Sequence, residues 1–321
     1  MPALITHRLF GEEALPALPE HLRATASQRT AFLLGNQGPD PFFFAVTTPR
    51  GSVVREMGHR MHNERMAACF DTLRAGVSRL PAAVRDTGLA FVCGLLGHYA
   101  LDRTAHPYVY AHEFALCDDN PELHDAYHEV HALIESDIDA GMLHALRGTT
   151  TAQVAPVSAI EGDVEAERAG GALLADCALS VFGLPLRPGD YAGGLADMRL
   201  CYRTIEPAGS RRSRGIGALE RRARPHSQME ALAHRSDLDE TCASMHPKRR
   251  PWTNPCLPAD DPAAASTDSF RDRFDTAQRL YRLLLSGLLD GTPACELTRG
   301  INYEGQQLGP DETAVAFGRP L

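Results

Sequence analysis

Hydrophobic residues recur every three or four positions along most of the first two thirds of the chain. This spacing places them on one face of an α-helix, and the alternation typical of a half-buried β-strand is nearly absent. Only Phe42–Val46 has the pattern of an extended stretch. We therefore predict an all-α fold. The expected helices lie within residues 53–80, 82–101, 120–146, 166–182, 191–204 and 267–289.

The stretch Ala82–Leu101 is apolar on almost every side, which predicts a helix buried at the centre of the fold. Pro107 follows shortly afterwards, and a proline commonly ends a helix. Asn120 and Pro121 then fit the N-cap and the first position of another helix, which should reach about Leu146. The last predicted helix is amphipathic, and its apolar face should pack back on the core.

The length of 321 residues allows about two domains. Helical enzymes of this size often fold as one body, however, and the sequence contains no internal repeat. We expect a single helical domain over residues 1–321 with three segments. These are a metal-binding core over 1–205, an irregular segment rich in Arg and Pro over 206–265, and a helix with a weakly patterned tail over 266–321.

The composition excludes several classes of protein. Hydrophobic residues make up 44% and charged residues 23% of the chain, which is typical of a globular protein. The longest apolar run is too short to form a transmembrane segment, and the first residues lack the features of a signal peptide. The eight cysteines form no CxxC pair, so we expect reduced thiols and a cytoplasmic location. A net charge of −9 argues against a general binder of polyanions.

Histidine is unusually frequent, and two of the histidines in the first half of the chain precede an acidic residue by four positions. His98 and Asp102 share one helical face, and His131 and Glu135 share another. Composition alone would produce about two such pairs in this chain. The first pair, however, lies in or next to the apolar stretch, where a His and an Asp are not buried without partners. These four residues are therefore candidate metal ligands.

Three further groups extend this pattern. His106 follows one turn after Asp102, Asp40 lies in a tight Gly-Pro-Asp-Pro turn, and His62 lies in the preceding predicted helix. Imidazole nitrogens together with carboxylate oxygens form the mixed ligand set that Zn²⁺ binds. The sequence therefore predicts a zinc centre.

The order of these groups resembles the zinc-dependent phospholipase C family, whose fold is shared by the zinc-dependent single-strand nucleases. The resemblance covers about residues 3–140. It implies an all-α fold with three zinc ions at the bottom of a cleft. The motifs that carry it are Thr6-His7-Arg-Leu-Phe-Gly11-Glu, Gly38-Pro-Asp40, Gly58-x3-His62, Gly97-His98-x3-Asp102-x3-His106-Pro and His131-x3-Glu135.

The same resemblance implies a ligand set for each ion. The ligands of the first ion would be Asp40, His62 and His98. The ligands of the second ion would be His106, His131 and Glu135. His7 would bind a third ion, and Asp102 would bridge that ion to the first. His59 is an alternative to the ligand at position 62, and His128 is an alternative to the ligand at position 131.

A further ligand is expected at the N-terminus. In the secreted relatives, the third ion is chelated by an N-terminal tryptophan, whereas the only tryptophan here is Trp252. This chain begins Met1-Pro2, and a small second residue favours removal of the initiator methionine. The free amine and the carbonyl group of Pro2 would then reach the ion bound by His7, since a bend of a few residues is sufficient. We therefore expect Pro2 to be a metal ligand.

The resemblance implies a zinc-dependent hydrolase acting on phosphodiester bonds, with a phosphodiester small molecule or a phospholipid headgroup as the substrate. A Zn²⁺ cluster neutralises the anionic phosphate, lowers the pKa of a water molecule towards about 7 and stabilises in-line displacement. Asp40 is the candidate catalytic residue, as a proton acceptor for that water, although it could equally serve only as a ligand. The alternatives are a single-strand nuclease or nucleotidase, and a helical protein that binds zinc without turnover.

Two features outside the ligand set bear on the substrate. The basic clusters at Arg211–Arg224 and Lys248–Arg250 could steer an anionic headgroup or a single-stranded nucleic acid to the cleft. The alternative is a solvated loop that balances an acidic body. We expect at least two of the three phenylalanines at 42–44 to pack in the core. A phenylalanine that does not pack there could form a lip of the cleft.

Overall fold

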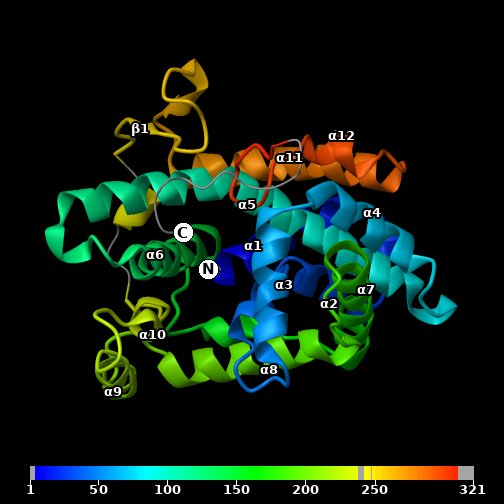
Figure 1. Ribbon diagram of the computed structural model, residues 1–321, viewed down its shortest axis with the longest axis horizontal. Helices are drawn as coiled ribbons and strands as arrows, with labels where there is room; N and C mark the ends of the chain where they lie inside the picture. Colours follow the sequence, from blue (N-terminus) through cyan, green and yellow to red (C-terminus); the bar gives the residue numbers. More distant parts are fainter. Residues whose placement is uncertain (1–3, 238–241, 247, 310–321) are drawn as a thin grey trace.

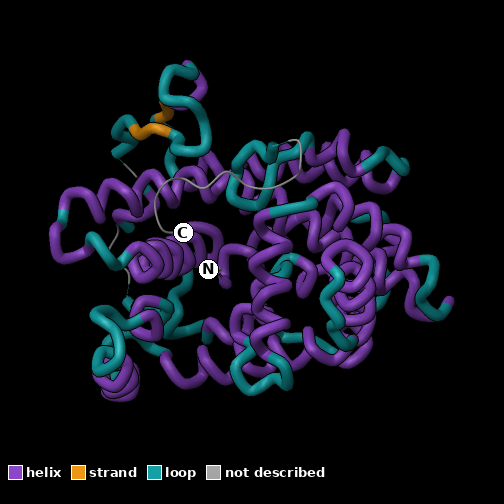
Figure 2. Tube along the Cα trace, viewed as in Figure 1, coloured by secondary structure: helices purple, strands orange, loops and turns teal. Residues whose placement is uncertain are grey.

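The computed structural model describes residues 4–237, 242–246 and 248–309. These residues are mostly helical, which confirms the predicted fold class (Figure 1), and Figure 2 shows how little strand accompanies the helices. No helix in these ranges is long and apolar enough to span a membrane.

The α-helices are α1 (Leu4–Ala14), α2 (Ala26–Gly35), α3 (Gly51–Asn63), α4 (Met66–Val77), α5 (Arg85–Asp119), α6 (Tyr127–Arg147), α7 (Val164–Phe182), α8 (Pro188–Ile205), α9 (Arg211–Glu220), α10 (Gln228–Ala231), α11 (Phe270–Leu289) and α12 (Ala294–Thr298). The strands β1 (Trp252–Thr253) and β2 (Ala265–Ser266) pair antiparallel.

The long helix α5 is the centre of the fold, as its apolar sequence predicts. It packs against α2, α6, α7 and α11. Where α2 crosses it, the two backbones are in contact. A Cβ atom added to Gly94 would lie 2.0 Å from the carbonyl oxygen of Phe32, and one added to Gly35 would lie 2.2 Å from that of Phe91. Only glycine allows this approach, and the crossing fixes the end of α2 against the middle of α5.

Helix α5 continues through Pro107, so the predicted helix end is wrong. Proline has no backbone N–H and leaves carbonyl groups of the preceding turn without their usual partners. A tertiary contact to a neighbouring carbonyl group supports that turn. The guanidinium group of Arg273 on α11 donates two hydrogen bonds to the carbonyl oxygen of Thr104, at 3.0 and 2.9 Å. Residues on both sides of Pro107 therefore project from one continuous helix.

Two other boundaries differ from the expectation. The stretch 53–80 forms two helices, because Arg65 adopts a left-handed conformation with φ of 58° between α3 and α4. The stretch Phe42–Val46 is not extended, because Asp40–Phe44 forms a 3₁₀ helix, η3. Both differences depend on local turn geometry, which cannot be predicted from the spacing of hydrophobic residues.

The helix expected to start at Pro121 begins later. Asn120 ends α5, and a short 3₁₀ helix over Pro121–Leu123 precedes α6, which starts at Tyr127. The irregular segment 206–265 contains short helices, and it also contains strand β1, which is not predicted from the sequence. The weakly patterned tail, in contrast, returns to the interior, because Asn302, Tyr303 and Glu304 are all buried.

A buried ionic network joins α1, α6 and the irregular segment. Asp139 on α6 accepts hydrogen bonds from the backbone N–H groups of Ile5 and Thr6, both at 2.7 Å, so a side chain from another helix caps α1. On the other side, Nε2 of His234 lies 3.0 Å from Asp139, and its Nδ1 lies 2.5 Å from Glu206. This network fixes the position of α1, which carries His7.

The same network predicts a pH dependence of stability. Burial alone would lower the pKa of His234, but its hydrogen bonds to Asp139 and Glu206 raise that pKa to about 9. The stabilisation is therefore complete below the unfolded-state pKa of about 6.5 and is lost as the pH rises through about 9. We expect the wild type to lose about 3 kcal/mol more unfolding free energy than His234→Gln between pH 6 and pH 10. Denaturant titrations of both proteins measure this difference, and equal losses would contradict it.

Candidate metal centre

Five of the predicted ligands meet in one buried group, which we call the first cluster. Asp102 lies at its centre, with Oδ1 at 3.0 Å from Nε2 of His7 and Oδ2 at 2.9 Å from Nε2 of His98. Oδ1 of Asp40 lies 3.1 Å from Nε2 of His62 and 3.7 Å from Nε2 of His98. None of the five is more than 4% exposed. They come from α1, η3, α3 and α5, so the tertiary fold assembles the cluster.

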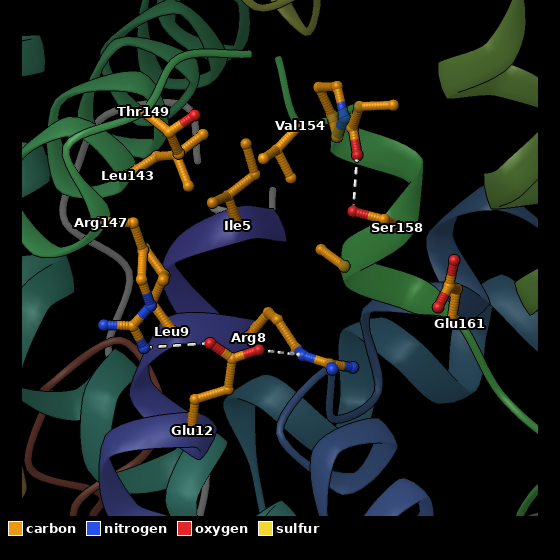
Figure 3. A pocket seen from close by; sticks show the side chains of 13 residues that line it. Ile5, Arg8, Leu9, Glu12, Leu143, Arg147, Thr149, Val154, Ser158 and Glu161 are labelled. Carbon is orange, nitrogen blue, oxygen red and sulfur yellow. Dashed lines mark hydrogen bonds and ion pairs between the residues drawn. The ribbon is translucent and has the colours of Figure 1, made fainter.

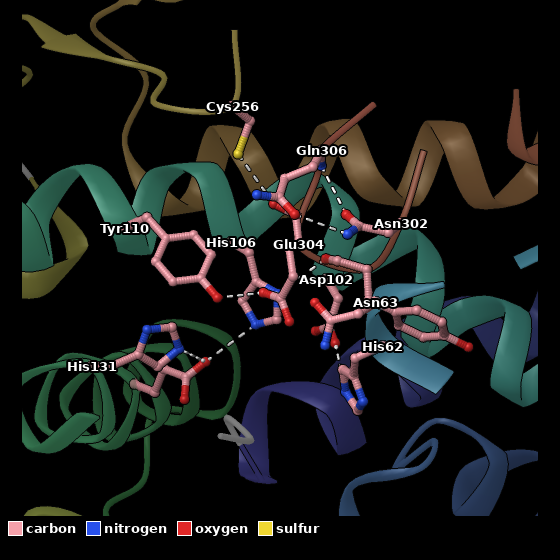
Figure 4. Close-up of polar contacts among 12 residues, drawn as sticks. His62, Asn63, Asp102, His106, Tyr110, His131, Cys256, Asn302, Glu304 and Gln306 are labelled. Atoms are coloured by element: carbon pink, nitrogen blue, oxygen red, sulfur yellow. Dashed lines mark hydrogen bonds and ion pairs between the residues drawn. The ribbon is translucent and has the colours of Figure 1, made fainter. Parts of the chain in front are cut away.

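Three further predicted ligands form a second cluster. Oε1 of Glu135 lies 3.3 Å from Nε2 of His131 and 3.6 Å from Nε2 of His106 (Figure 4). The ligand atoms of the three residues all lie within 4.8 Å of one another. Ligands at about 2 Å from one Zn²⁺ ion would have a similar mutual spacing. The second cluster is therefore a candidate site for one ion.

The ring orientation of two histidines in the first cluster is fixed by backbone carbonyl groups. Nδ1 of His62 lies 2.8 Å from the carbonyl oxygen of Gly58, and Nδ1 of His98 lies 3.0 Å from that of Asn36. Gly38, with φ of +56°, is needed here because an added Cβ atom would lie 2.4 Å from the His98 ring. Each of these imidazoles thus directs Nε2 into the cluster, as a metal-binding histidine does.

Carboxylates take this supporting role in the second cluster. Nδ1 of His131 lies 2.7 Å from Oε2 of Glu113. Nδ1 of His106 lies 3.0 Å from Oε2 of Glu304 and also 3.0 Å from the carbonyl oxygen of Tyr303. Figure 4 shows His106 between Glu304 and His131. Such carboxylate–histidine contacts fix the ring and increase its basicity toward a metal.

Glu113 and Glu304 are not among the residues predicted from the sequence. Glu113 lies seven residues after His106 and therefore on the same face of α5, a spacing that could have revealed it once the helix was known to pass Pro107. Glu304 lies in the weakly patterned tail, almost two hundred residues from its partner, and no local pattern marks it. Only the tertiary fold shows its role.

The electrostatics of the first cluster favour a bound cation. Burial would lower the pKa of His98, but the carboxylates of Asp102 and Asp40 raise it. Burial would raise the pKa of Asp102, but His98, His106 and His7 hold it well below its usual range. A metal ion bound here would compete with protons for these groups.

In the second cluster, burial and neighbouring charges again shift the pKa values in opposite directions. Burial would lower the pKa of His106, but Glu304 and Asp102 raise it well above its usual value. Burial would raise the pKa of Glu304, but contact with His106 lowers it to about 2. A site with this concentration of anionic oxygens and imidazoles fits Zn²⁺ by ligand type.

Buried polar atoms without hydrogen-bond partners provide an independent test of the fit. In the described part of the chain, Oδ2 of Asp40 is such an atom. Nε2 of His98 has only ion-pair contacts, with Asp102 and Asp40, and Nε2 of His131 has only its ion-pair contact with Glu135. Native proteins rarely leave buried polar atoms unsatisfied, and a bound ion can supply the partner that such atoms need. All three atoms belong to predicted ligands, so the residues fit a metal centre.

The structure separates the two alternative histidines from the clusters. His59 and His128 are exposed, whereas His62 and His131 are buried beside the other ligands. Pro2, the predicted N-terminal ligand, lies outside the described residues, so its role stays a prediction.

A cleft of about 440 Å³ opens over both clusters. His62 of the first cluster and His131 of the second both line it, and Phe43 forms part of its wall, with its ring centroid 5.0 Å from that of His62. Phe42 and Phe44 are buried in the core, in line with the expectation that at least two of the three phenylalanines pack there. The remaining lining residues are His59, Asn63, Tyr110, Glu113, His128, Arg224, Gln228 and Glu304.

A second hollow of about 380 Å³ lies between α1, α6 and the segment 149–161 (Figure 3). Its walls are apolar residues such as Ile5 and Leu9. Its charged groups are engaged with one another, because Glu12 pairs with Arg8 at 2.8 Å and with Arg147 at 3.0 Å. It holds no histidine or cysteine among the described residues.

The contact between Glu304 and His106 leads to a prediction. Replacing Glu304 by Gln removes the charge that supports His106, so zinc bound at the second cluster should be held about 10- to 100-fold more weakly. Zinc retained during competition with a chelator, read by elemental analysis, measures this loss. Glu296→Gln is the matched control, because Glu296 is exposed on α12. Equal zinc retention in the two variants would contradict the supporting role of Glu304.

Comparison with known proteins agrees with this geometry. Residues 6–150 match the family model described as zinc dependent phospholipase C. Comparisons with curated proteins and with solved structures gave no match. The matched segment contains every ligand candidate from His7 to Glu135, and it confirms the resemblance that the motifs indicate. The segment that carries the candidate metal centre is thus similar to the zinc-dependent phospholipase C family.

Proposed function

We propose that this protein is a zinc-dependent hydrolase that cleaves a phosphodiester bond of a phospholipid headgroup. The observation that carries the proposal is the position of the two clusters, which are both buried and both border the same cleft. The similarity of residues 6–150 to the zinc-dependent phospholipase C family supports the choice of substrate.

Two to three zinc ions would bind in this proposal. Asp40, His62 and His98 would hold the first ion, with Asp102 shared with a third ion at His7. The second ion would bind the remaining three ligands, namely His106, His131 and Glu135. The convergence of ligand atoms within each cluster supports metal binding. In the second cluster it matches the proposed ligand set, whereas in the first cluster the atoms group as His7, Asp40 and His98 and as His62, His98 and Asp102.

When bound, Zn²⁺ would neutralise the phosphate oxygens and provide an activated water molecule at neutral pH. The residues of the chain would position the phosphodiester between the clusters and accept the proton. Asp40 is the best candidate for the proton acceptor, because its Oδ2 is buried and has no hydrogen-bond partner among the described residues. No Ser, Cys or Lys nucleophile is needed.

The cleft walls support binding of a headgroup. The aromatic rings of Phe43 and Tyr110 provide apolar surface, while Arg224 and Gln228 provide polar groups at the same cleft. A guanidinium group is well suited to contact a phosphate oxygen. The cleft volume of about 440 Å³ falls in the range typical of small-molecule sites.

Hydrolysis of bis-p-nitrophenyl phosphate by zinc-loaded protein tests the reaction class. We expect turnover that a chelator abolishes and that added zinc restores. Parallel assays with phosphatidylcholine micelles and with single-stranded DNA then separate a phospholipase from a nuclease. Full zinc loading by elemental analysis without hydrolysis of any of these substrates would contradict the proposal and favour a non-catalytic zinc protein.

A further inference from the structure

A strongly cationic stretch lies at the cleft and outside the family-matched segment. It comprises residues 211–224, which form α9 and the turn after it, and we call it the basic rim. Six arginines and one glutamate give it a formal charge of +5, in a chain whose net charge is −9. Charge of one sign is thus concentrated in a short segment of an otherwise acidic molecule, which is typical of a surface that binds an anionic partner.

Several charges of the basic rim are not neutralised within the fold. Arg221 pairs with Glu230, and Arg224 pairs with acidic residues on α6 and α9. Arg211, Arg214 and Arg222 are exposed, and no acid in the described ranges lies within ion-pair distance of them. Their charges therefore face solvent and are available to a partner.

The basic rim is continuous with the mouth of the cleft. Arg224, its last residue, lines the cleft together with Gln228 on α10. Arg222 is only two residues away, which limits their Cα separation to about 7 Å. In Figure 1, α9 and α10 lie together at one end of the molecule, and α10 packs on α6, the helix that carries His131. A surface bound by the basic rim would consequently lie beside the cleft.

The outer face of α9 also has apolar surface. Leu219 is 64% exposed and lies among the arginines, while Ser213 and Gly217 on the opposite side are buried. An exposed leucine flanked by arginines is typical of a helix that lies in the interface of a lipid bilayer. Single-stranded nucleic acids, in contrast, are bound by aromatic residues on which bases stack, and residues 211–224 contain no aromatic residue.

We propose that the basic rim docks on an anionic lipid surface and so places the cleft at the phospholipid headgroups. The charge of the basic rim, the exposed Leu219 and the position of Arg224 at the cleft support this partner. The inference rests on the proposed phospholipid substrate, because docking beside the cleft brings that substrate to the metal centre.

Vesicle flotation of the zinc-loaded protein tests the docking surface. The vesicles consist of phosphatidylcholine alone or of phosphatidylcholine mixed with phosphatidylserine. We expect binding only to the mixed vesicles, with weaker binding at higher ionic strength. The double variant Arg211→Gln/Arg222→Gln should bind about 25-fold more weakly, since each arginine at an anionic surface contributes about a fivefold effect.

The matched control removes two arginines elsewhere. Arg279 and Arg282 are exposed on α11, which lies on the other side of the molecule from α9 in Figure 1. Arg279→Gln/Arg282→Gln makes the same change in net charge and should retain wild-type binding. Leu219→Ser should weaken binding to mixed vesicles without changing its salt dependence.

Two results would overturn the inference. The first is equal vesicle binding by the rim variant and the control variant. The second is tighter binding of a single-stranded oligonucleotide than of mixed vesicles, lost in the rim variant. Wild-type hydrolysis of soluble bis-p-nitrophenyl phosphate is measured separately. Its absence contradicts the proposed reaction and leaves the vesicle result intact, so the two failures are distinguishable.

Discussion

Asp102→Asn should remove bound zinc and lower phosphodiester hydrolysis by about a thousandfold, because metal ions supply several kcal/mol of transition-state stabilisation. Asp102 contacts both His7 and His98, at 3.0 and 2.9 Å. The amide has nearly the same shape as the carboxylate but carries no charge. Zinc content by elemental analysis and the rate on bis-p-nitrophenyl phosphate are the measurements.

Two further variants make this test specific. His98→Ala should have a similar effect, because it deletes the imidazole that lies between Asp102 and the backbone of Asn36. His124→Ala should change neither zinc content nor rate, since His124 is exposed and lies outside both clusters. An unchanged zinc content in Asp102→Asn and His98→Ala would exclude the first cluster as a metal site.

Gly94→Ala should destabilise the fold by about 3 kcal/mol. Its new methyl group would lie 2.0 Å from the carbonyl oxygen of Phe32, so α2 and α5 would have to move apart. That movement would also displace Asn36, whose carbonyl group orients His98. The unfolding free energy in denaturant is the measurement, and a loss of bound zinc should accompany its decrease.

Gly215→Ala is the matched control for this substitution. Gly215 lies within α9, and a Cβ atom added there would have no described neighbour within 4 Å. Alanine at an open helical position should stabilise the protein by about 0.5 to 1 kcal/mol. A decrease in unfolding free energy for Gly94→Ala and an increase for Gly215→Ala would show that the helix crossing, rather than the loss of a glycine as such, causes the destabilisation. A small change in unfolding free energy for Gly94→Ala would contradict the prediction, because it would show that the crossing of α2 and α5 accommodates a methyl group.

Much of the helical architecture is predictable from the sequence because burial imposes a period on it. The apolar stretch Ala82–Leu101 predicts a central helix, and α5 lies at the centre. The spacing of His98 with Asp102, and of His131 with Glu135, predicts shared helical faces, and both pairs are in contact. These features depend on neighbours within one turn, so the local sequence is sufficient to predict them.

Other boundaries depend on contacts between distant segments. Pro107 indicates a helix end, but Arg273 donates hydrogen bonds to the backbone of the preceding turn from a helix far along the chain. Arg65 divides a continuous hydrophobic pattern into two helices through its left-handed conformation. Spacing alone reports neither effect, because it contains no information on the partners of the backbone.

The sequence by itself determined the helical class and the residue types of the candidate metal centre, through periodicity and the order of its histidines and acids. Only the tertiary structure decided which groups support those ligands and what borders the cleft. Glu304 reaches His106 from the weakly patterned tail, and Arg224 reaches the cleft from the irregular segment. Neither residue belongs to a local sequence pattern. Each contacts residues that are distant in the sequence, and such contacts depend on the folded arrangement rather than on the spacing of neighbouring residues.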